Sequence, residues 1–249
     1  FIHGFEAKYF KKKNLIEKLF LWILYSLEGW CLRSAEIVIP NSEGFINTLI
    51  KDYKVNKLKI HSIPLGIDIY EEKKINITQN KRLKNIKNKI ESYNNLEITT
   101  LVYAGSLDTV HDPIFLKKLA QNIKNNKLPI KLYIFGESKN HEELSKNYEC
   151  IIAAGLFSKA ELHQLLKMFD FGLYFSKNKF PYNAILGNKI FDYSLANIPT
   201  LVLEDHSYLN EFAETNGIGF KVDPNKLDMP QINQLRNNQK IEENLKTFC

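Results

Sequence analysis

The sequence contains few cysteines, and their spacing excludes two common kinds of cysteine site. Only Cys31, Cys150 and Cys249 occur among 249 residues, and no two of them form a Cys-x-x-Cys pair. Three scattered cysteines build neither the disulfide framework of a small secreted protein nor a four-ligand zinc site. We therefore expect a reducing, cytosolic compartment.

Long hydrophobic runs are also missing. The longest, residues 19–27 (LFLWILYSL), is about half as long as a membrane-spanning helix of roughly 20 residues. No basic, apolar and small-residue pattern of a signal peptide opens the chain, which starts with Phe1 and Ile2. We interpret this start as one inside a fold, as in a fragment of a longer protein.

Acidic residues are scarce in the first third of the chain. Residues 1–90 contain 17 Lys and Arg against 9 Asp and Glu, whereas residues 91–249 contain 17 against 19. This excess of positive charge predicts a basic surface that faces a membrane or a phosphorylated ligand. A bias toward lysine without any partner explains it equally well. No helix-turn-helix, RNA-recognition or zinc-finger pattern is present, so we expect no nucleic-acid partner.

The remaining composition, 44% hydrophobic and 25% charged, is that of a chain that buries a core. From residue 98 onward, short apolar runs alternate with helix-like segments. Strands that are buried on both faces have continuous apolar runs, and this alternation predicts an α/β domain with a doubly wound parallel sheet. We expect strands at residues 98–104, 130–135, 150–153, 171–176, 199–203 and 218–222, and helices at residues 113–125, 140–147, 158–168, 187–196 and 207–215.

The N-terminal part has a less regular pattern. Helical spacing covers residues 14–33, residues 36–40 and 60–63 resemble short strands, and Ser42 can cap a helix that ends near Tyr53. A polar segment rich in Lys and Asn follows. The sequence therefore predicts three parts: residues 1–70, a linker with a surface helix at residues 71–95, and a ligand-binding domain at residues 96–249.

Glycines follow three of the predicted strands. Because ligands of such sheets bind outside the carboxyl ends of the strands, these positions are candidates for a binding edge. A single turn glycine is more often structural, but three at equivalent positions favour close approach of a ligand to the backbone. The candidate residues are Gly105 and Ser106 after the first strand, Gly136 and Glu137 after the second, and Leu156 and Phe157, which follow Gly155, after the third.

The segment that begins with Gly187, Asn188 and Lys189 opens a predicted helix. Free N–H groups at a helix N-terminus attract anions, and a lysine adds a positive charge suited to phosphate. Asp192 lies one turn later, where a carboxylate can accept hydrogen bonds from ribose hydroxyls. Alternatively, Lys189 and Asp192 are a solvated surface pair.

Four segments together resemble one family. Residues 187–193 (GNKIFDY) with 196–199 (ANIP) resemble the nucleotide-sugar motif of family 4 retaining glycosyltransferases. Residues 35–42, 63–68 and 101–106 resemble three further segments of that family, in the same order. The resemblance implies a GT-B architecture, with two Rossmann-like domains of which the N-terminal one is present here only in its last part. It also places His3 where the family has an active-site histidine.

The sequence departs from the family at two points. The family's first carboxylate of the motif, eight residues before Asp192, is replaced by Ala184. The Arg and Lys that hold the diphosphate after the first strand are absent from residues 108–112, so Lys189 is the candidate replacement. Both departures leave open a non-catalytic sugar-nucleotide-binding protein as an alternative, and a GT-B-like sugar-nucleotide epimerase is another.

The resemblance implies transfer of a sugar, with retained configuration, from a nucleoside-diphosphate sugar to a glycan or lipid-linked acceptor. It further implies no metal or other cofactor, a role in bacterial surface polysaccharide synthesis, and a cytoplasmic protein that works near the inner membrane face. The apolar helix at residues 14–33, behind Lys11, Lys12 and Lys13, is either an interfacial membrane helix or part of a domain core.

Overall fold

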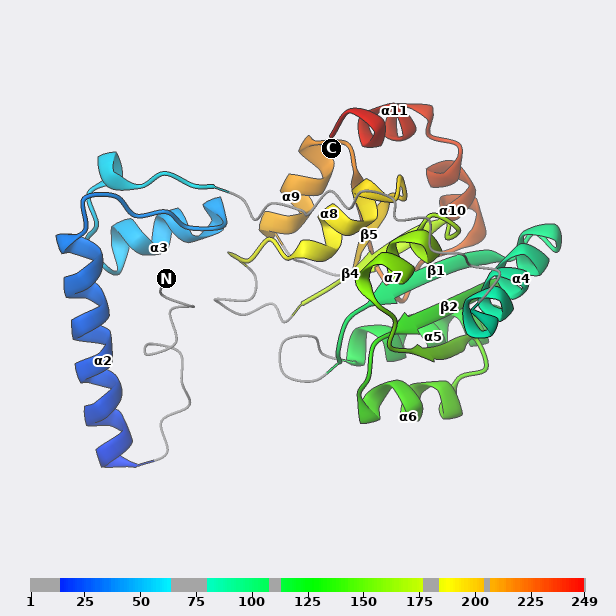
Figure 1. The fold of residues 1–249 in the computed structure, drawn as a ribbon, viewed down its shortest axis with the longest axis horizontal. Coiled ribbons are helices and arrows are strands. Elements are labelled where there is room, and N and C mark those ends of the chain that lie inside the picture. Colours follow the sequence, from blue (N-terminus) through cyan, green and yellow to red (C-terminus); the bar gives the residue numbers. More distant parts are fainter. Residues whose placement is uncertain (1–13, 64–79, 108–112, 177–183, 204–206, 249) are drawn as a thin grey trace. The chain divides into compact units, whose positions relative to one another are not determined.

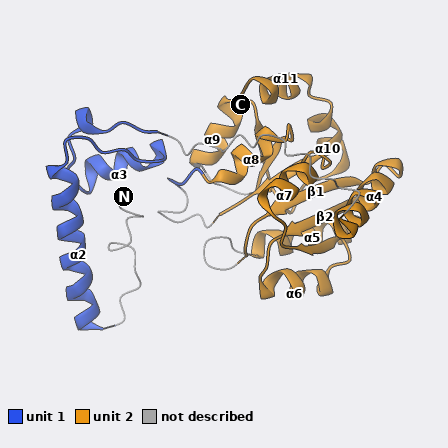
Figure 2. Ribbon diagram, in the orientation of Figure 1, with its two compact units in different colours: residues 1–66, 178–186 blue, residues 67–177, 187–249 orange. Residues whose placement is uncertain are grey.

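The computed structural model describes residues 14–63, 80–107, 113–176, 184–203 and 207–248. The chain divides into two compact units, unit 1 with residues 1–66 and 178–186, and unit 2 with residues 67–177 and 187–249 (Figure 2). The described part of the predicted linker, residues 80–95, forms helix α4 (Lys81–Asn95) with its N-cap, and it belongs to unit 2. Leu83 and Ile90 on one face of α4 are buried in the core of this unit. This helix is therefore amphipathic and packed, because its apolar residues recur at helical spacing.

Unit 2 is built on a six-stranded parallel sheet with the strand order β3-β2-β1-β4-β5-β6 (Figure 1). Every neighbouring pair of strands is parallel, and each strand lies where the sequence predicts it. The order reverses between β1 and β4, which makes this the place where such sheets open a crevice for a ligand. The strands are β1 (Thr99–Ala104), β2 (Ile130–Phe135), β3 (Ile151–Gly155), β4 (Phe171–Tyr174), β5 (Thr200–Leu203) and β6 (Gly219–Val222).

Helices cover both faces of this sheet, as the doubly wound prediction requires. Successive residues of β1 point to opposite faces, so Leu101 lies in one core cluster and Val102 in the other. The Leu101 face is covered by α5 (Ile114–Asn125), α6 (Lys139–Asn147) and α10 (Met229–Arg236). The Val102 face is covered by α4, α7 (Lys159–Leu166) and α8 (Asn188–Leu195). Helix α9 (Ser207–Thr215) contacts β5 and β6, and α11 (Gln239–Phe248) contacts α8.

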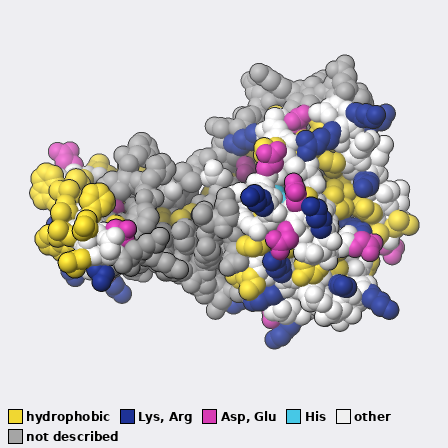
Figure 3. Space-filling model, turned by 90° about the horizontal axis from the view of Figure 1, so that it is seen from below, with side chains coloured by type: hydrophobic (Ala, Val, Ile, Leu, Met, Phe, Trp, Pro, Cys, Tyr) yellow, Lys and Arg dark blue, Asp and Glu magenta, His cyan; other side chains and the backbone are white. Residues whose placement is uncertain are grey.

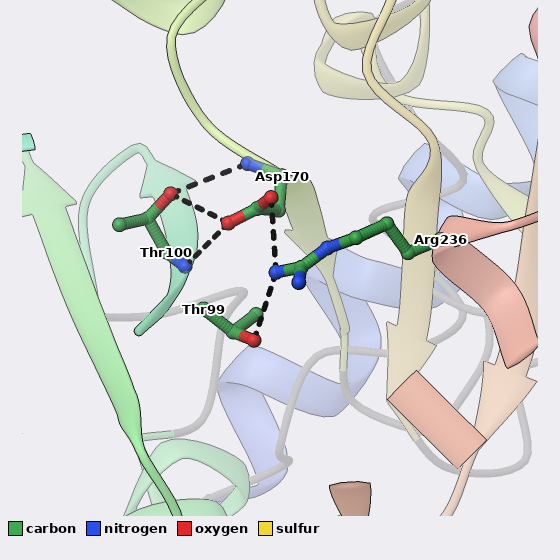
Figure 4. A network of polar contacts seen from close by, with 4 residues as sticks. All are labelled: Thr99, Thr100, Asp170 and Arg236. Atoms are coloured by element: carbon green, nitrogen blue, oxygen red, sulfur yellow. Dashed lines mark hydrogen bonds and ion pairs between the residues drawn. The ribbon is translucent and has the colours of Figure 1, made fainter. Parts of the chain in front are cut away.

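A polar network ties α10 to the amino ends of β1 and β4 (Figure 4). The Asp170 carboxylate accepts the backbone N–H of Thr100 at 2.7 Å and its hydroxyl at 2.9 Å. Arg236 forms an ion pair with Asp170 at 3.1 Å and donates to the Thr99 hydroxyl at 3.0 Å. The network lies at the edge of the sheet opposite the strand exits, so its contribution is to the stability of unit 2.

Unit 1 consists of short elements around a small core. They are α2 (Leu15–Ser34), the 3-10 helices η1 (Glu43–Phe45) and η2 (Lys57–Lys59), and α3 (Ile46–Lys51). The two segments predicted as strands meet in a single parallel bridge between Val38 and Ile60. The buried residues of this core are Leu32, Val38, Phe45, Leu49, Tyr53, Val55 and Ala184.

Helix α2 exposes most of its apolar side chains. Trp22 is 65% and Trp30 62% exposed, and Leu15 and Ile16 are each 81% exposed. Figure 3 shows hydrophobic side chains gathered over the described surface of unit 1. No helix in the described part of the chain is long and apolar enough to cross a membrane. A run of exposed apolar side chains of this length is unusual on the surface of a folded domain.

Candidate functional site

Tyr193 fixes helix α8 at the switch point of the sheet. Its side chain is fully buried, and its hydroxyl donates to the carbonyl oxygen of Leu173 in β4 at 3.2 Å. The same hydroxyl accepts the backbone N–H of Ala104 in β1 at 3.1 Å. A side chain at Gly172 would collide with the Tyr193 ring, so glycine is required there. The tyrosine of the predicted motif therefore joins α8 to both strands that flank the crevice.

Lys189 lies one turn before Tyr193 on α8, and its side chain reaches the exit of β1. A methyl group placed on Gly105 would lie 2.6 Å from Lys189 Cε and 2.9 Å from Nζ. The ammonium group also lies 5.5 Å from the ring centroid of Tyr103 and 5.9 Å from that of Tyr174. Gly105 has a φ of 150°, a conformation that other residues rarely adopt. The structure thus brings together two predicted site residues that stand 84 positions apart.

This environment changes the acid–base properties of the lysine. Burial lowers the pKa of Lys189 from 10.5 to about 8, and the negative charge of Asp192 opposes that shift. A desolvated ammonium group gains more from an anionic ligand than a solvated one does, because less water has to be displaced. The position of Lys189 is therefore suited to a phosphate group.

The first residues of α8 differ in their freedom to bind an anion. The N–H of Gly187, predicted as a donor to phosphate, donates to the Tyr174 hydroxyl at 3.0 Å in this structure. Asn188 is exposed at the first helical position. Of these two amides, Asn188 is therefore the better placed candidate.

The exits of β1, β2 and β3 lie next to one another. The N–H of Gly105 donates to the carbonyl of Phe135, and that of Gly136 donates to the carbonyl of Gly155. Ser106 is exposed, and its carbonyl accepts the Tyr103 hydroxyl at 2.9 Å. Glu137 follows Gly136 and is exposed. The glycines predicted as strand exits thus form one continuous edge.

Asp192 points toward α7. It lines a small cavity together with Lys159 and His163, whose positive charges oppose the rise that burial causes in the pKa of Asp192. Lys189 and Asp192 of α8 therefore face different neighbours, with Lys189 at the β1 exit and Asp192 beside α7.

The β3–α7 loop, residues 156–158, carries the other predicted pair. Leu156 is 54% exposed. The ring of Phe157 packs edge-on against Phe135 at a centroid distance of 5.5 Å. Leu156 can therefore contact a ligand, whereas Phe157 holds the loop against the core.

His3, the predicted active-site histidine, and residues 108–112 lie outside the described residues. Ala184 is buried in the core of unit 1, where its carbonyl accepts the Ser42 hydroxyl at 2.5 Å. The described residues contain no group of three or more His, Cys, Asp and Glu side chains that could hold a metal ion.

Sequence reasoning missed the tyrosines that build the site. Tyr103, Tyr174 and Tyr193 are all buried, and burial raises the pKa of Tyr174 to about 12. Each belongs to a buried strand or to the predicted motif, so each resembled an ordinary core residue. The tyrosine hydroxyl was the signal that could have identified them, because a buried hydroxyl needs a hydrogen-bond partner. In the structure these hydroxyls bond to backbone groups beside the crevice.

No protein-family model and no curated protein sequence matches the chain. Solved structures match its fold. Anabaena HepE in complex with UDP is 17% identical with a TM-score of 0.62, and the match covers 98% of this chain and 64% of HepE. WaaG, a glycosyltransferase involved in lipopolysaccharide biosynthesis, is 13% identical with a TM-score of 0.59, over 96% of this chain and 65% of WaaG.

An S. aureus TarM mutant in complex with UDP is 13% identical with a TM-score of 0.58, and the match covers 99% of this chain and 44% of TarM. The chain thus spans less than two thirds of the length of each of these proteins. At these identities the likeness is one of fold. The α/β fold of the chain, with its six-stranded parallel sheet, is that of GT-B glycosyltransferases, as the sequence predicts.

Proposed function

We propose that the chain binds a nucleoside-diphosphate sugar and transfers the sugar to a glycan or lipid-linked acceptor. The observation that carries this proposal is the Lys189 ammonium group beside Gly105, at the switch point of a doubly wound sheet. A diphosphate needs a positive charge and close access to backbone, and this place offers both. The structural neighbour HepE, crystallised with UDP-glucose, makes a uridine nucleotide the first donor to test.

Each predicted residue has a role in this proposal. Lys189 and the amide of Asn188 bind the diphosphate, and Gly105 lets it approach the backbone. Asp192 accepts hydrogen bonds from ribose. The β3–α7 loop, with Leu156 exposed, contacts the base.

The chemistry of transfer is cleavage of the bond between the anomeric carbon and the diphosphate oxygen. The bonding electron pair leaves with the nucleoside diphosphate, whose developing negative charge Lys189 stabilises. An acceptor hydroxyl forms the new bond to the anomeric carbon from the same face, and its proton passes to the departing phosphate oxygen. Attack from this face retains the configuration, as the resemblance to family 4 implies. We propose that no metal ion takes part, and activity that persists in EDTA would support this.

Calorimetric titration of the chain with UDP, GDP and ADP tests the binding step. We expect one nucleotide to bind selectively, and binding to weaken in Lys189→Met and in Asp192→Asn. Lys246→Met is a control that removes an equally positive but exposed side chain on α11. If no nucleotide binds, or if Lys189→Met binds as tightly as the unaltered chain, the donor-site assignment is wrong.

A binding protein without transferase activity is the second candidate, and the position of Ala184 favours it. Here the residue that replaces the family's sugar-facing carboxylate is buried in unit 1. Release of nucleoside diphosphate from a bound nucleotide sugar in the presence of acceptor glycans separates the two candidates. Binding without release would assign the chain to the binding proteins.

We also propose that the exposed apolar face of α2 contacts a membrane surface peripherally. Its two tryptophans are both exposed, and tryptophan is enriched at membrane–water interfaces. The positive excess of the first third of the chain would add attraction to anionic lipid. Co-sedimentation with phosphatidylglycerol vesicles should fall in a Trp22→Ser, Trp30→Ser variant but not in Leu58→Ser, a control at an 84% exposed leucine outside α2. A chain that stays in the supernatant would assign this face to a protein contact.

A further inference from the structure

The first turn of α4 reaches the carboxyl edge of the sheet. Helix α4 precedes β1 directly and packs along it, so the helix runs antiparallel to the strand and its beginning lies near the strand exits (Figure 1). The Asn80 side chain caps this helix by accepting the N–H groups of Arg82 and Leu83. Its amide also donates to Glu161 of α7 at 2.9 Å.

Glu161 in turn fixes the start of α7. It accepts the N–H of Ser158 at 2.9 Å and the Ser158 hydroxyl at 2.8 Å, while its own N–H donates to that hydroxyl at 3.3 Å. These bonds lower the pKa of Glu161, so the carboxylate is charged at neutral pH. One end of the β3–α7 loop is therefore tied to α4.

Arg82 holds the other end of the same loop. Its guanidinium group donates to the carbonyl of Leu156 at 3.0 Å and also to the carbonyl of Ala154, on the two sides of Gly155. The guanidinium carbon lies 4.2 Å from the ring centroid of Phe157. A planar group with several fixed donors can bridge two carbonyls and stack on a ring at once, which an ammonium group cannot do.

The backbone between these carbonyls has an unusual conformation. Gly155 has a φ of 76°, and a side chain there would collide with the Arg82 guanidinium. In the described part of the chain, Arg82 forms no ion pair with a carboxylate. Its hydrogen-bond donors go to the loop instead, and its charge also stabilises the Glu161 carboxylate at the other end of that loop. Arg82 therefore acts on the shape of the loop.

We propose that Arg82 is a positioning residue that holds the β3–α7 loop in the shape that accepts the nucleotide base. This inference rests on the proposed function, which places the base against Leu156. A loop already fixed in its bound shape loses less conformational entropy when ligand binds, and its backbone groups are held where they can discriminate between bases. Arg82 touches neither the diphosphate nor the ribose in this assignment.

The variant Arg82→Lys tests this role, because it keeps the positive charge but cannot bridge both carbonyls. The full 249-residue chain should bind UDP about 3- to 10-fold more weakly in this variant, whereas inorganic pyrophosphate should bind unchanged. Its preference among UDP, GDP and ADP should shrink. Lys84→Met, which removes an exposed charge from the same helix, should change none of these affinities.

Hydrogen–deuterium exchange gives a second measurement that needs no ligand. The amides of residues 155–158 should exchange faster in Arg82→Lys, while those of β1 stay as in the unaltered chain. Equal losses of UDP and pyrophosphate affinity, or unchanged exchange in the loop together with unchanged base preference, would overturn the proposal. If the unaltered chain binds no nucleoside diphosphate, the proposed function fails and the base-positioning role fails with it. Unchanged binding in Arg82→Lys, beside a functional wild type, overturns the role of Arg82 alone.

Discussion

Replacement of Lys189 by methionine should weaken nucleoside-diphosphate binding more than any other single change in unit 2. Methionine has a similar length and fills the space beside Gly105, Tyr103 and Tyr174 without the charge. A hydrogen bond between charged groups contributes about 1.5–3 kcal/mol, so we expect UDP to bind roughly 10- to 150-fold more weakly.

The pKa of Lys189 adds a dependence on pH that can be worked out in advance. With a pKa of about 8, roughly three quarters of the free chains carry the charge at pH 7.5 and about one tenth at pH 9. Bound diphosphate favours the charged lysine and raises its pKa. The dissociation constant for UDP should therefore rise roughly eightfold between these two pH values. In Lys189→Met this rise should be absent.

The free energy of unfolding supplies an independent check, because Lys189 should make it rise with pH whereas UDP affinity should fall. Because the pKa of Lys189 is lower in the folded chain than its ordinary value of 10.5, the folded state binds fewer protons between about pH 8 and 10.5. This group therefore makes stability increase with pH across that range, and the increase is missing below about pH 8.

Calorimetry with UDP at pH 7.5 and 9, and urea unfolding at pH 7.5 and 10, measure both effects. Lys246→Met is the matched control, since it removes an exposed lysine on α11 that forms an i, i+4 pair with Glu242. Equal pH dependence of UDP binding in the unaltered chain and in Lys189→Met would refute the argument, because the titrating group would then be another one.

Three further variants separate binding from stability. Asp192→Asn should weaken UDP binding about 10-fold but leave pyrophosphate binding unchanged, as calorimetry can show, because the carboxylate is assigned to ribose. Gly105→Ala should cost about 1–3 kcal/mol of stability and should weaken UDP binding less than Lys189→Met does, because alanine is strained at this φ and its methyl group meets Lys189. Arg236→Met should lower the urea-derived unfolding free energy by about 1–2 kcal/mol with UDP affinity unchanged, because it leaves Asp170 without its cation.

The fold of unit 2 could be predicted from the sequence because its signals are local. Each strand is a short apolar run bounded by polar or turn residues, and burial on both faces follows from that composition. The helix predicted at residues 158–168 begins with a capping box of Ser158 and Glu161, whose Ser-x-x-Glu spacing is itself a local sequence signal. The signal for packing was weaker in α4, because most of its residues are polar. Three apolar residues at helical spacing, Leu83, Ile86 and Ile90, pack against the core.

Unit 1 could be predicted less well, because its contacts are not local. The two segments expected as strands share only the bridge between Val38 and Ile60. Ala184, more than 120 residues away in sequence, completes the core, and its carbonyl bonds to Ser42. No period or propensity in residues 14–63 indicates that a distant segment would pack there.

The candidate site shows why residue types are easier to predict than their partners. A lysine at a helix start and a glycine at a strand exit each have a local signal, but only the fold brings Lys189 to Gly105. That approach depends on Tyr193, whose hydroxyl joins α8 to β1 and β4, and on Gly172, which makes room for its ring. If the proposed function holds, Lys189 of α8 supplies the positive charge that the resembled family places after its first strand and that residues 108–112 lack. Gly105 at that exit then has to be glycine for two reasons: its φ is one that other residues rarely adopt, and a side chain there would collide with Lys189.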